Sequence, residues 1–524
     1  MNCLKSTGIA LLAATTLAAT PAIAQDKVSL TVNTVQIFGT VDPAKVNDYT
    51  EYMAIVNLYD ALTTVDGDGK IVPQLAESWE ISDDSKTYTF KLKDGATFQD
   101  GSPVEAKDVV WSLQRLIALN EGPAYLFAEL IKPENVKAVD ERTVEITLNR
   151  VHSPFIASTP LILVVNSDLV KEQNDGEWGE TFLADKPSGA GPYKLDNWTR
   201  GSGMTLSRYD GYHSGWTKGR PIDELRFIVT RDEATVKALA TRGELGMSSQ
   251  YQGSETYEAI DKLDDYHVLS VDTATGFYLK LNNQRPPTDD VHIRRAIAYA
   301  MDYATIREVI YPGSELKGPL APAFADAYDN DLPAPEFNLE RAAEELKKSK
   351  YADGGPVKLS HVYVAKTAFE EEIGLLFKAT LDSIGFDVDL RPEPWNRITE
   401  LASSPETTPN VTQVFYGPTY PSPDSVFFVQ YHSKAKGTWS SMSWVDDPQI
   451  DALIDKARET VETGPRNEIY KDLQVRLQER QSDVFLLAQN KRIAANSCLK
   501  GYYQVPMQSW DYDFAHMWWD CEAK

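Results

Sequence analysis

The chain has 524 residues, and its 77 acidic against 52 basic side chains give it a formal net charge of −25. A chain of this length exceeds what one hydrophobic core usually organises, so we expect at least two lobes. The excess of negative charge argues against nucleic acid and anionic lipid surfaces as partners.

The first residues have the pattern of an export signal. Lys5 supplies a positive start, residues 9–19 (IALLAATTLAA) form an apolar run, and residues 22–24 (AIA) give the small-x-small pattern that signal peptidase cleaves. The apolar run is shorter than the roughly 20 residues that span a membrane. We therefore expect residues 1–24 to be a cleaved signal peptide and the mature protein to be periplasmic.

Two cysteines follow that segment, Cys498 and Cys521. In an oxidising compartment such a pair predicts a disulfide that ties the C-terminal tail back on itself, and two free buried thiols are the alternative. Neither cysteine belongs to a C-x-x-C motif, so a redox or zinc role has no support.

Strand-like and helix-like runs alternate along the chain, which indicates an α/β fold. Two segments alternate polar and apolar residues between turn signals, Thr87–Leu92 (TYTFKL) and residues 142–148 (RTVEITL). We expect both to be half-buried strands.

A helix followed by a strand is predicted in the second half of the chain. Thr367 and Glu370 have the spacing of a capping box, and apolar residues recur at helical spacing over residues 367–384. Residues 386–390 then read as a strand. Further helices are predicted at residues 290–310, 450–461 and 466–480.

The chain lacks the motifs of common enzyme chemistry. No two of its seven histidines have metal-ligand spacing, and no G-x-S-x-G, P-loop or dinucleotide fingerprint occurs. We expect no enzyme activity and no cofactor.

Several blocks, in order along the chain, resemble one known family. They are residues 73–79 (PQLAESW), 87–92 (TYTFKL), 188–195 (SGAGPYKL), 278–302 (YLKLNNQRPPTDDVHIRRAIAYAMD) and 446–457. Together they resemble extracellular solute-binding protein family 5, the oligopeptide, dipeptide and nickel group of ABC-importer receptors.

The resemblance implies a two-lobed α/β periplasmic binding protein with two hinge crossings and an extra subdomain in the first lobe. By that resemblance, lobe I comprises residues 28–275 plus 490–524, with the subdomain at about 61–186. Lobe II comprises residues 276–489. The hinges are expected near residues 278–282 and 486–489.

The same resemblance implies a function. Two lobes joined by short strands can close on a ligand that contacts both sides, and an importer can recognise the closed form. We expect a small-molecule solute, a transient ABC permease partner and a monomer.

The family's peptide receptors hold the peptide amine with an aspartate four residues before a proline. In the corresponding loop, residues 416–423 (YGPTYPSP), that position is Thr419. A hydroxyl cannot offset a buried ammonium as a carboxylate can. This departure favours an oligosaccharide or sugar conjugate, while an oligopeptide receptor that uses Asp48 or Asp424 is the alternative.

Sugars need aromatic faces and dense polar partners. We expect Trp395, Trp439 and Trp510 to enclose the solute. The hydrogen-bonding residues are expected to be Tyr49, Glu51, Ser249, Tyr416 and Thr419. Arg397 is the candidate cation for an acidic ligand. A nickel or metal-chelate receptor and a periplasmic hydrolase are the other hypotheses, and neither has supporting motifs.

Overall fold

The computed structural model describes residues 27–35, 39–46, 48–173, 175–216 and 219–521. The predicted signal peptide, residues 1–24, lies outside the described residues.

The first lobe is built on a four-stranded sheet with the order β1-β11-β9-β8. Its strands are β1 (Ser29–Thr34), β11 (Glu224–Val229), β9 (Gly203–Arg208) and β8 (Tyr193–Thr199), of which β1 and β11 are parallel. Near it lie α1 (Tyr49–Leu58) and a three-stranded sheet in which the C-terminal strand β19 (Trp518–Trp519) pairs with β10 (Arg220–Pro221) on one side and with β18 (Leu499–Lys500) on the other. Its buried core includes Leu30, Val32 and Phe227.

A second sheet of the first lobe carries the predicted strand TYTFKL. Its order is β4-β5-β7-β6, with β4 (Ala76–Ile81), β5 (Thr87–Leu92), β7 (Thr143–Thr147) and β6 (Val136–Asp140). In β5, Tyr88, Phe90 and Leu92 are buried while their neighbours are half-exposed, as the alternation predicts. Around it are the strands β2 (Thr63–Val65) and β3 (Ile71–Pro73) and the helices α2 (Ala106–Leu119), α3 (Phe155–Ser158), α4 (Ser167–Glu172) and α5 (Glu180–Leu183).

The second lobe is built on a six-stranded mixed sheet with the order β13-β17-β12-β16-β14-β15. These strands are β13 (Gly313–Ser314), β17 (Asp483–Asn496), β12 (Tyr266–Leu281), β16 (Val411–Tyr416), β14 (Val357–Val364) and β15 (Phe386–Glu393). Its helices are α8 (Val291–Tyr299), α9 (Tyr303–Thr305), α10 (Leu339–Lys348), α11 (Ala368–Asp382), α12 (Trp395–Leu401), α13 (Pro423–Tyr431), α14 (Pro448–Glu459) and α15 (Thr463–Glu479).

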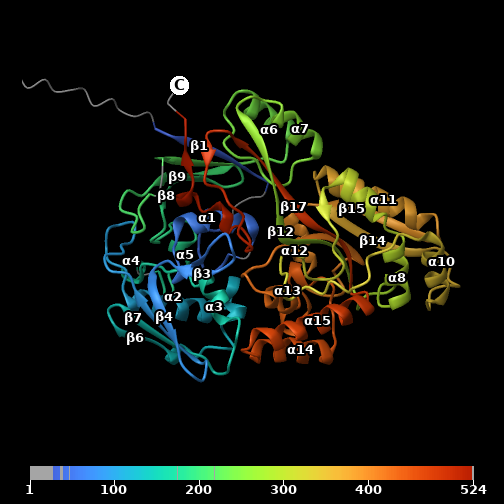
Figure 1. Cartoon of the computed structure of the whole chain (residues 1–524), viewed down its shortest axis with the longest axis horizontal. Helices are drawn as coiled ribbons and strands as arrows, with labels where there is room; N and C mark the ends of the chain where they lie inside the picture. Colours follow the sequence, from blue (N-terminus) through green and yellow to red (C-terminus); the bar gives the residue numbers. More distant parts are fainter. Residues whose placement is uncertain (1–26, 36–38, 47, 174, 217–218, 522–524) are drawn as a thin grey trace, which may run out of the picture.

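The strands β12 and β17 connect the two lobes (Figure 1). They pair antiparallel from Tyr266 and Asn496 to Lys280 and Asp483. The helices α6 (Glu233–Thr241) and α7 (Ser254–Asp261) lie beside the end of this pair that belongs to the first lobe (Figure 1). The chain is therefore a two-lobed α/β protein, as expected.

The predicted helix at residues 290–310 is wrong as one continuous element. The helix α8 ends at Tyr299, and the short helix α9 and a single π turn, Ile306–Ile310, follow. The side chain of Asp302 accepts a hydrogen bond from the backbone N–H of Thr305 at 3.0 Å and so starts a new helix. A short acidic side chain that bonds nearby backbone competes with helix continuation, and helical periodicity does not reveal this.

The predicted disulfide between Cys498 and Cys521 is present and closes a loop across 23 positions. It joins the turn before β18 to the residues after β19, so it fixes the end of the described chain to the first lobe.

Replacing both cysteines with serine should destabilise the protein by at most about 3.4 kcal/mol, because opening a loop of this length increases the conformational entropy of the unfolded chain by about that much. Thermal melts should show that reductant lowers the Tm of the wild type to that of the double variant and leaves the double variant unchanged. A wild-type Tm that does not respond to reductant or to the substitutions would contradict this role.

Candidate functional site

A pocket lies between the two lobes, at the point where β12 and β17 pass from one lobe to the other. It contains about 900 Å³ not filled by protein atoms, including the space open to solvent at its mouth. The first lobe contributes residues near positions 48–49, 231, 250–251 and 504–511, and the second lobe contributes residues near positions 364–370, 395, 413–418 and 439. Ligand sites commonly lie in such interlobe clefts.

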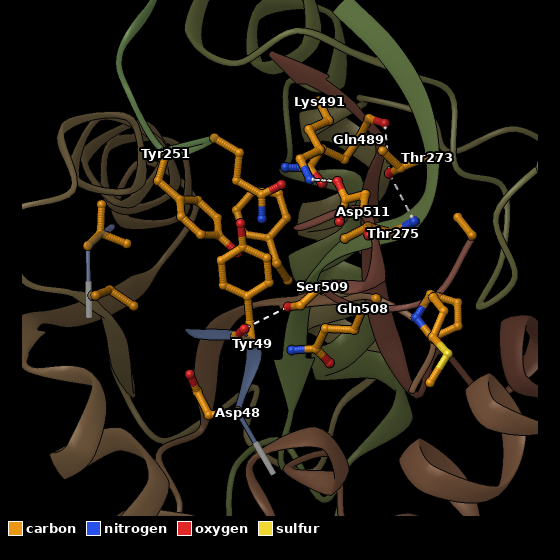
Figure 2. Close-up of a pocket in the computed structure, with 18 of the residues that line it drawn as sticks. Asp48, Tyr49, Tyr251, Thr273, Thr275, Gln489, Lys491, Gln508, Ser509 and Asp511 are labelled. Atoms are coloured by element: carbon orange, nitrogen blue, oxygen red, sulfur yellow. Dashed lines mark hydrogen bonds and ion pairs between the residues drawn. The ribbon is translucent and has the colours of Figure 1, made fainter. Parts of the chain in front are cut away.

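The floor of the pocket is a break in the β12 and β17 ladder. The pairing shifts between Asp272 and Gly276, and Thr273, Thr275 and Gln489 line the pocket there. The hydroxyl of Thr273 donates to the backbone oxygen of Gln489 at 3.1 Å and accepts from the backbone N–H of Thr275 at 3.1 Å (Figure 2). The hydroxyl thus replaces hydrogen bonds that the interrupted ladder does not make.

The wall from the first lobe contains a buried ion pair. Lys491 on β17 pairs with Asp511, and both residues are only 3% exposed (Figure 2). The hydroxyl of Tyr502 donates a further hydrogen bond to Asp511 at 2.7 Å. Burial lowers the pKa of Lys491, and the charge of Asp511 opposes that shift. The charges of Lys491 and Asp511 therefore balance each other within the protein.

Tyrosine rings stand beside this ion pair. The ring of Tyr49 meets the ring of Tyr251 edge to face, with 5.9 Å between the centroids (Figure 2). The hydroxyl of Tyr49 bonds that of Tyr512 at 2.7 Å, and the Ser509 hydroxyl donates to the backbone oxygen of Tyr49 at 2.6 Å. Burial raises the pKa of the Tyr49 hydroxyl well above its ordinary value.

The facing wall carries two tryptophans. Trp395, at the start of α12, and Trp439 meet edge to face with 5.4 Å between their centroids. The indole N–H of Trp395 donates to the Asp48 carboxylate at 2.8 Å, across the pocket from one lobe to the other. Five glutamines also line the pocket, namely Gln250, Gln413, Gln489, Gln504 and Gln508. The pocket therefore offers aromatic faces together with amide groups that both donate and accept.

The first turn of α11 opens onto the pocket, and its predicted capping box does not form. The carboxyl of Glu370 accepts from the backbone N–H of Val364 at 2.7 Å, while the Thr367 hydroxyl accepts from Arg231 at 2.9 Å and makes no cap bond. Thr367 and Glu370, which the local pattern paired with each other, thus bind partners from other segments of the chain instead. Burial raises the pKa of Glu370 to about 8, although the Val364 bond and the charge of Arg231 lower it.

Three of the predicted solute-binding residues line this pocket: Tyr49, Trp395 and Trp439. Tyr416 and Thr419 line an adjoining interlobe pocket of about 700 Å³, which shares Trp439 with the first. In that pocket the backbone N–H of Thr419 donates to the Ser425 hydroxyl at 2.8 Å.

The other predicted site residues are not among those lining the main pocket. Glu51 lies in the first turn of α1. The hydroxyl of Ser249 accepts from the backbone N–H of Tyr251 at 3.1 Å, so it stabilises a turn. Trp510 is buried, with its ring 5.3 Å from that of Tyr52.

Arg397 points to the surface. Its side chain is 52% exposed and pairs with Glu400 one turn further along α12 at 2.8 Å. Asp424, one of the alternative amine anchors, is buried beside Arg458, at 3.4 Å, and accepts from the hydroxyl of Tyr420. Asp48, the other alternative, does line the main pocket.

Sequence reasoning missed Arg231, Glu370, Gln413 and the Lys491–Asp511 pair as pocket residues. Only Glu370 had a recognisable pattern, and that pattern predicted a cap. Gln413 and Lys491 lie on strands, Arg231 follows a strand, and Asp511 lies in a 3-10 turn. Their convergence depends on how the two lobes meet.

Two further observations apply to the described part of the chain. No helix there is long and apolar enough to cross a membrane. No group of three or more His, Cys, Asp or Glu residues there is placed to hold a metal ion.

The fold and the interlobe pocket define a two-lobed binding protein. The family model "Bacterial extracellular solute-binding proteins, family 5 Middle" matches residues 70–438, and the chain belongs to this family. Members of the family bind small solutes and work with ABC permeases.

Curated relatives cover nearly the same length. The probable D,D-dipeptide-binding periplasmic protein DdpA of Escherichia coli is 25% identical over 89% of this chain and 90% of the relative. The dipeptide-binding protein of the same organism is 26% identical over 86% of this chain and 87% of the relative.

Solved structures show the same fold. The ABC transporter-associated periplasmic binding protein DppA of Helicobacter pylori in complex with the peptide STSA has a TM-score of 0.84 and 22% identity, covering 94% of this chain and 98% of the other. The binding protein AgaA of A. tumefaciens R10 in complex with agropinic acid has a TM-score of 0.81 and 23% identity, covering 94% and 99%. At these identities the likeness establishes the fold alone.

Glu370→Gln should remove a pH dependence of stability. Because the pKa of the folded carboxyl is about 8 and its ordinary value is 4.5, the folded protein retains a proton that the unfolded chain releases. The free energy of unfolding therefore falls as the pH rises from about 4.5 to about 8, by up to about 1.4 kcal/mol per pH unit.

The measurement is the Tm of wild type and variant across that pH range. The gain in Tm of Glu370→Gln over wild type should grow from pH 5 to pH 8, since glutamine can still accept from Val364. The exposed neighbour is the control, and Glu371→Gln should follow the wild-type curve. Parallel curves for wild type and Glu370→Gln would show that Glu370 is ionised in the folded protein.

Proposed function

We propose that this chain is the periplasmic receptor of an ABC importer and that it captures a small polar solute, an oligosaccharide or sugar conjugate, between its two lobes. The observation that carries the solute class is the composition of the pocket. Two tryptophans and two tyrosines supply ring faces, and five glutamines supply donors and acceptors. Sugar rings present C–H faces and closely spaced hydroxyls, which such a lining matches.

The proposal includes the organisation expected from the sequence. Lobe I comprises residues 28–275 and 490–524, with its subdomain at 61–186, and lobe II comprises residues 276–489. The break in pairing at 273–275 and 489 supports a hinge slightly N-terminal to the one expected at residues 278–282. A ladder with fewer hydrogen bonds bends more readily there, and closure then requires contacts to both lobes.

The remaining parts of the proposal concern the protein's setting. Residues 1–24 direct export and are removed, the mature receptor is a monomer, and it contacts the permease transiently. The periplasmic relatives support the location.

An oligopeptide or dipeptide remains the second candidate. Asp48 lines the pocket and could pair with a peptide amine, and relatives of this chain are named for dipeptides and glutathione. Against this, the position of the family's amine anchor is Thr419, which lies in the adjoining pocket.

Thermal-shift measurements separate the two solute classes. A solute that binds only the folded protein stabilises it by about 2.7 kcal/mol at 100 times its Kd. We expect oligosaccharides or sugar conjugates to raise the Tm and di- to pentapeptides to leave it unchanged. Stabilisation by peptides alone would replace the sugar proposal with the peptide one.

Trp395→Ala should weaken solute binding at least about tenfold, or about 1.4 kcal/mol, without unfolding the protein. The variant loses a ring face and the hydrogen bond to Asp48 that joins the lobes. Trp395→Phe retains a ring without the N–H, so it separates the two effects. Titration calorimetry is the measurement, and Trp198→Ala is the control because Trp198 lies on β8 outside the pocket. Unchanged affinity in Trp395→Ala would remove Trp395 from the site.

A further inference from the structure

Arg231 places a guanidinium group in the pocket. The residue follows β11 in the first lobe, and its side chain lines the pocket. One of its nitrogens donates to the hydroxyl of Thr367 in the second lobe at 2.9 Å. Within the described residues, no carboxylate oxygen forms an ion pair with this guanidinium.

The other charged groups of the pocket also have partners. Lys491 pairs with Asp511, and Asp48 accepts from the neutral indole of Trp395, so the charge of Asp48 still acts on Arg231 without forming an ion pair with it. The carboxyl of Glu370 accepts from Val364, and because burial raises its pKa to about 8, it is largely protonated at pH 7. Arg231 is therefore the cation of the described pocket whose charge no ion pair balances.

A partly buried guanidinium without a counter-charge is costly, and its planar fork suits a carboxylate. Burial lowers the pKa of Arg231, and Glu370, Tyr251 and Asp48, when they are ionised, oppose that shift. Arginine remains charged under these conditions. A ligand carboxylate would supply the missing counter-charge and two parallel hydrogen bonds.

The first turn of α11 lies beside Arg231 and also favours a negative group. Thr367 is its N-cap residue, and the first turn of this 15-residue helix has no side-chain cap, since the Thr367 hydroxyl accepts from Arg231. Uncapped N–H groups and the helix dipole favour a negative group there.

An independent observation also points to a ligand. Gln413 lines the pocket and is 1% exposed, and its buried side-chain oxygen has no hydrogen-bond partner among the described residues. A buried unsatisfied acceptor is unfavourable unless a donor reaches it, and a solute hydroxyl or N–H is such a donor.

We propose that Arg231, with the first turn of α11, binds a carboxylate of the solute, so that the transported class is acidic, with a uronate-type saccharide as the form that fits the sugar proposal. The inference rests on the proposed receptor function and deepens it. A carboxylate held there contacts the first lobe through Arg231 and the second through α11, so it favours the closed form.

Matched pairs of probes test the carboxylate. One pair is digalacturonate and its uncharged dimethyl ester, and the other is Ala-Ala-Ala and its C-terminal amide. Titration calorimetry would be run on the full mature protein, on Arg231→Gln and Arg231→Lys, and on Arg242→Gln. Arg242 is the control because it is 54% exposed and pairs with Glu244 at the surface.

At least one carboxylate probe should bind at least about tenfold more tightly than its uncharged partner. Arg231→Gln should abolish that preference, Arg231→Lys should retain part of it, and Arg242→Gln should leave it unchanged. Affinity of the uncharged partners should stay within about twofold in all variants, which separates a lost carboxylate contact from a damaged pocket.

The two proposals fail differently. If Ala-Ala-Ala binds tightly and its C-terminal amide binds weakly, the carboxylate site is supported and the sugar class is rejected. Binding of a neutral probe as tightly as its acid partner, no binding by either acid, or equal losses for both members of a pair in Arg231→Gln would overturn the carboxylate site.

Discussion

The antiparallel pairing of β12 with β17 is the constraint on which the two-lobed structure depends. At one end Leu269 pairs with Ile493 beside the first lobe, and at the other Leu279 pairs with Val484 in the core of the second. The ladder shifts between Asp272 and Gly276, where the strands pass from one core to the other. Backbone and side-chain polar groups released by that shift form the floor of the pocket. The same piece of backbone therefore connects the lobes and forms the floor of the pocket.

The cations buried elsewhere in the protein differ from Arg231 in the partners that stabilise them. Arg115 pairs with Asp42 at 2.6 Å in the first lobe, and Lys280 pairs with Asp483 at 3.0 Å in the second, all with almost no exposure. Arg294, which is 5% exposed, donates to three backbone carbonyl oxygens instead. Each of these cations is stabilised by the protein's own acceptors, as burial requires. The hydrogen-bond partner of Arg231 is one hydroxyl, that of Thr367, and this contrast supports the proposed ligand carboxylate.

The structure has its lobes in contact. The part of the first lobe around its second sheet meets the second lobe, where the backbone N–H of Ser153 donates to the Arg458 carbonyl at 2.7 Å and Lys434 pairs with Glu129 at 2.7 Å. Together with the Asp48 to Trp395 bond, these contacts hold the pocket between two walls. An exposed pair such as Lys434 and Glu129 contributes little free energy, so a bound solute would add a substantial part of what favours closure.

The sequence by itself determined the local elements and the family. The alternation in TYTFKL predicted β5 at its observed bounds, and helical spacing predicted α11, α14 and α15 to within a few residues. The expectation of an oxidising compartment predicted the disulfide between Cys498 and Cys521. These features depend on neighbours along the chain, on composition or on motifs that resemble those of a known family. The same local reasoning placed a capping box at Thr367 and Glu370 and a ligand cation at Arg397.

Only the tertiary structure decided which side chains meet in the pocket. Arg231 reaches Thr367 from 136 positions away in the sequence, and Asp48 reaches Trp395 from 347 positions away. No spacing rule links such pairs, because their distance is set by how two separately folded lobes meet across β12 and β17. The proposed site of solute binding is for that reason a property of the assembled lobes, and Arg231 could be proposed as its cation only after the ion pairs around it were known.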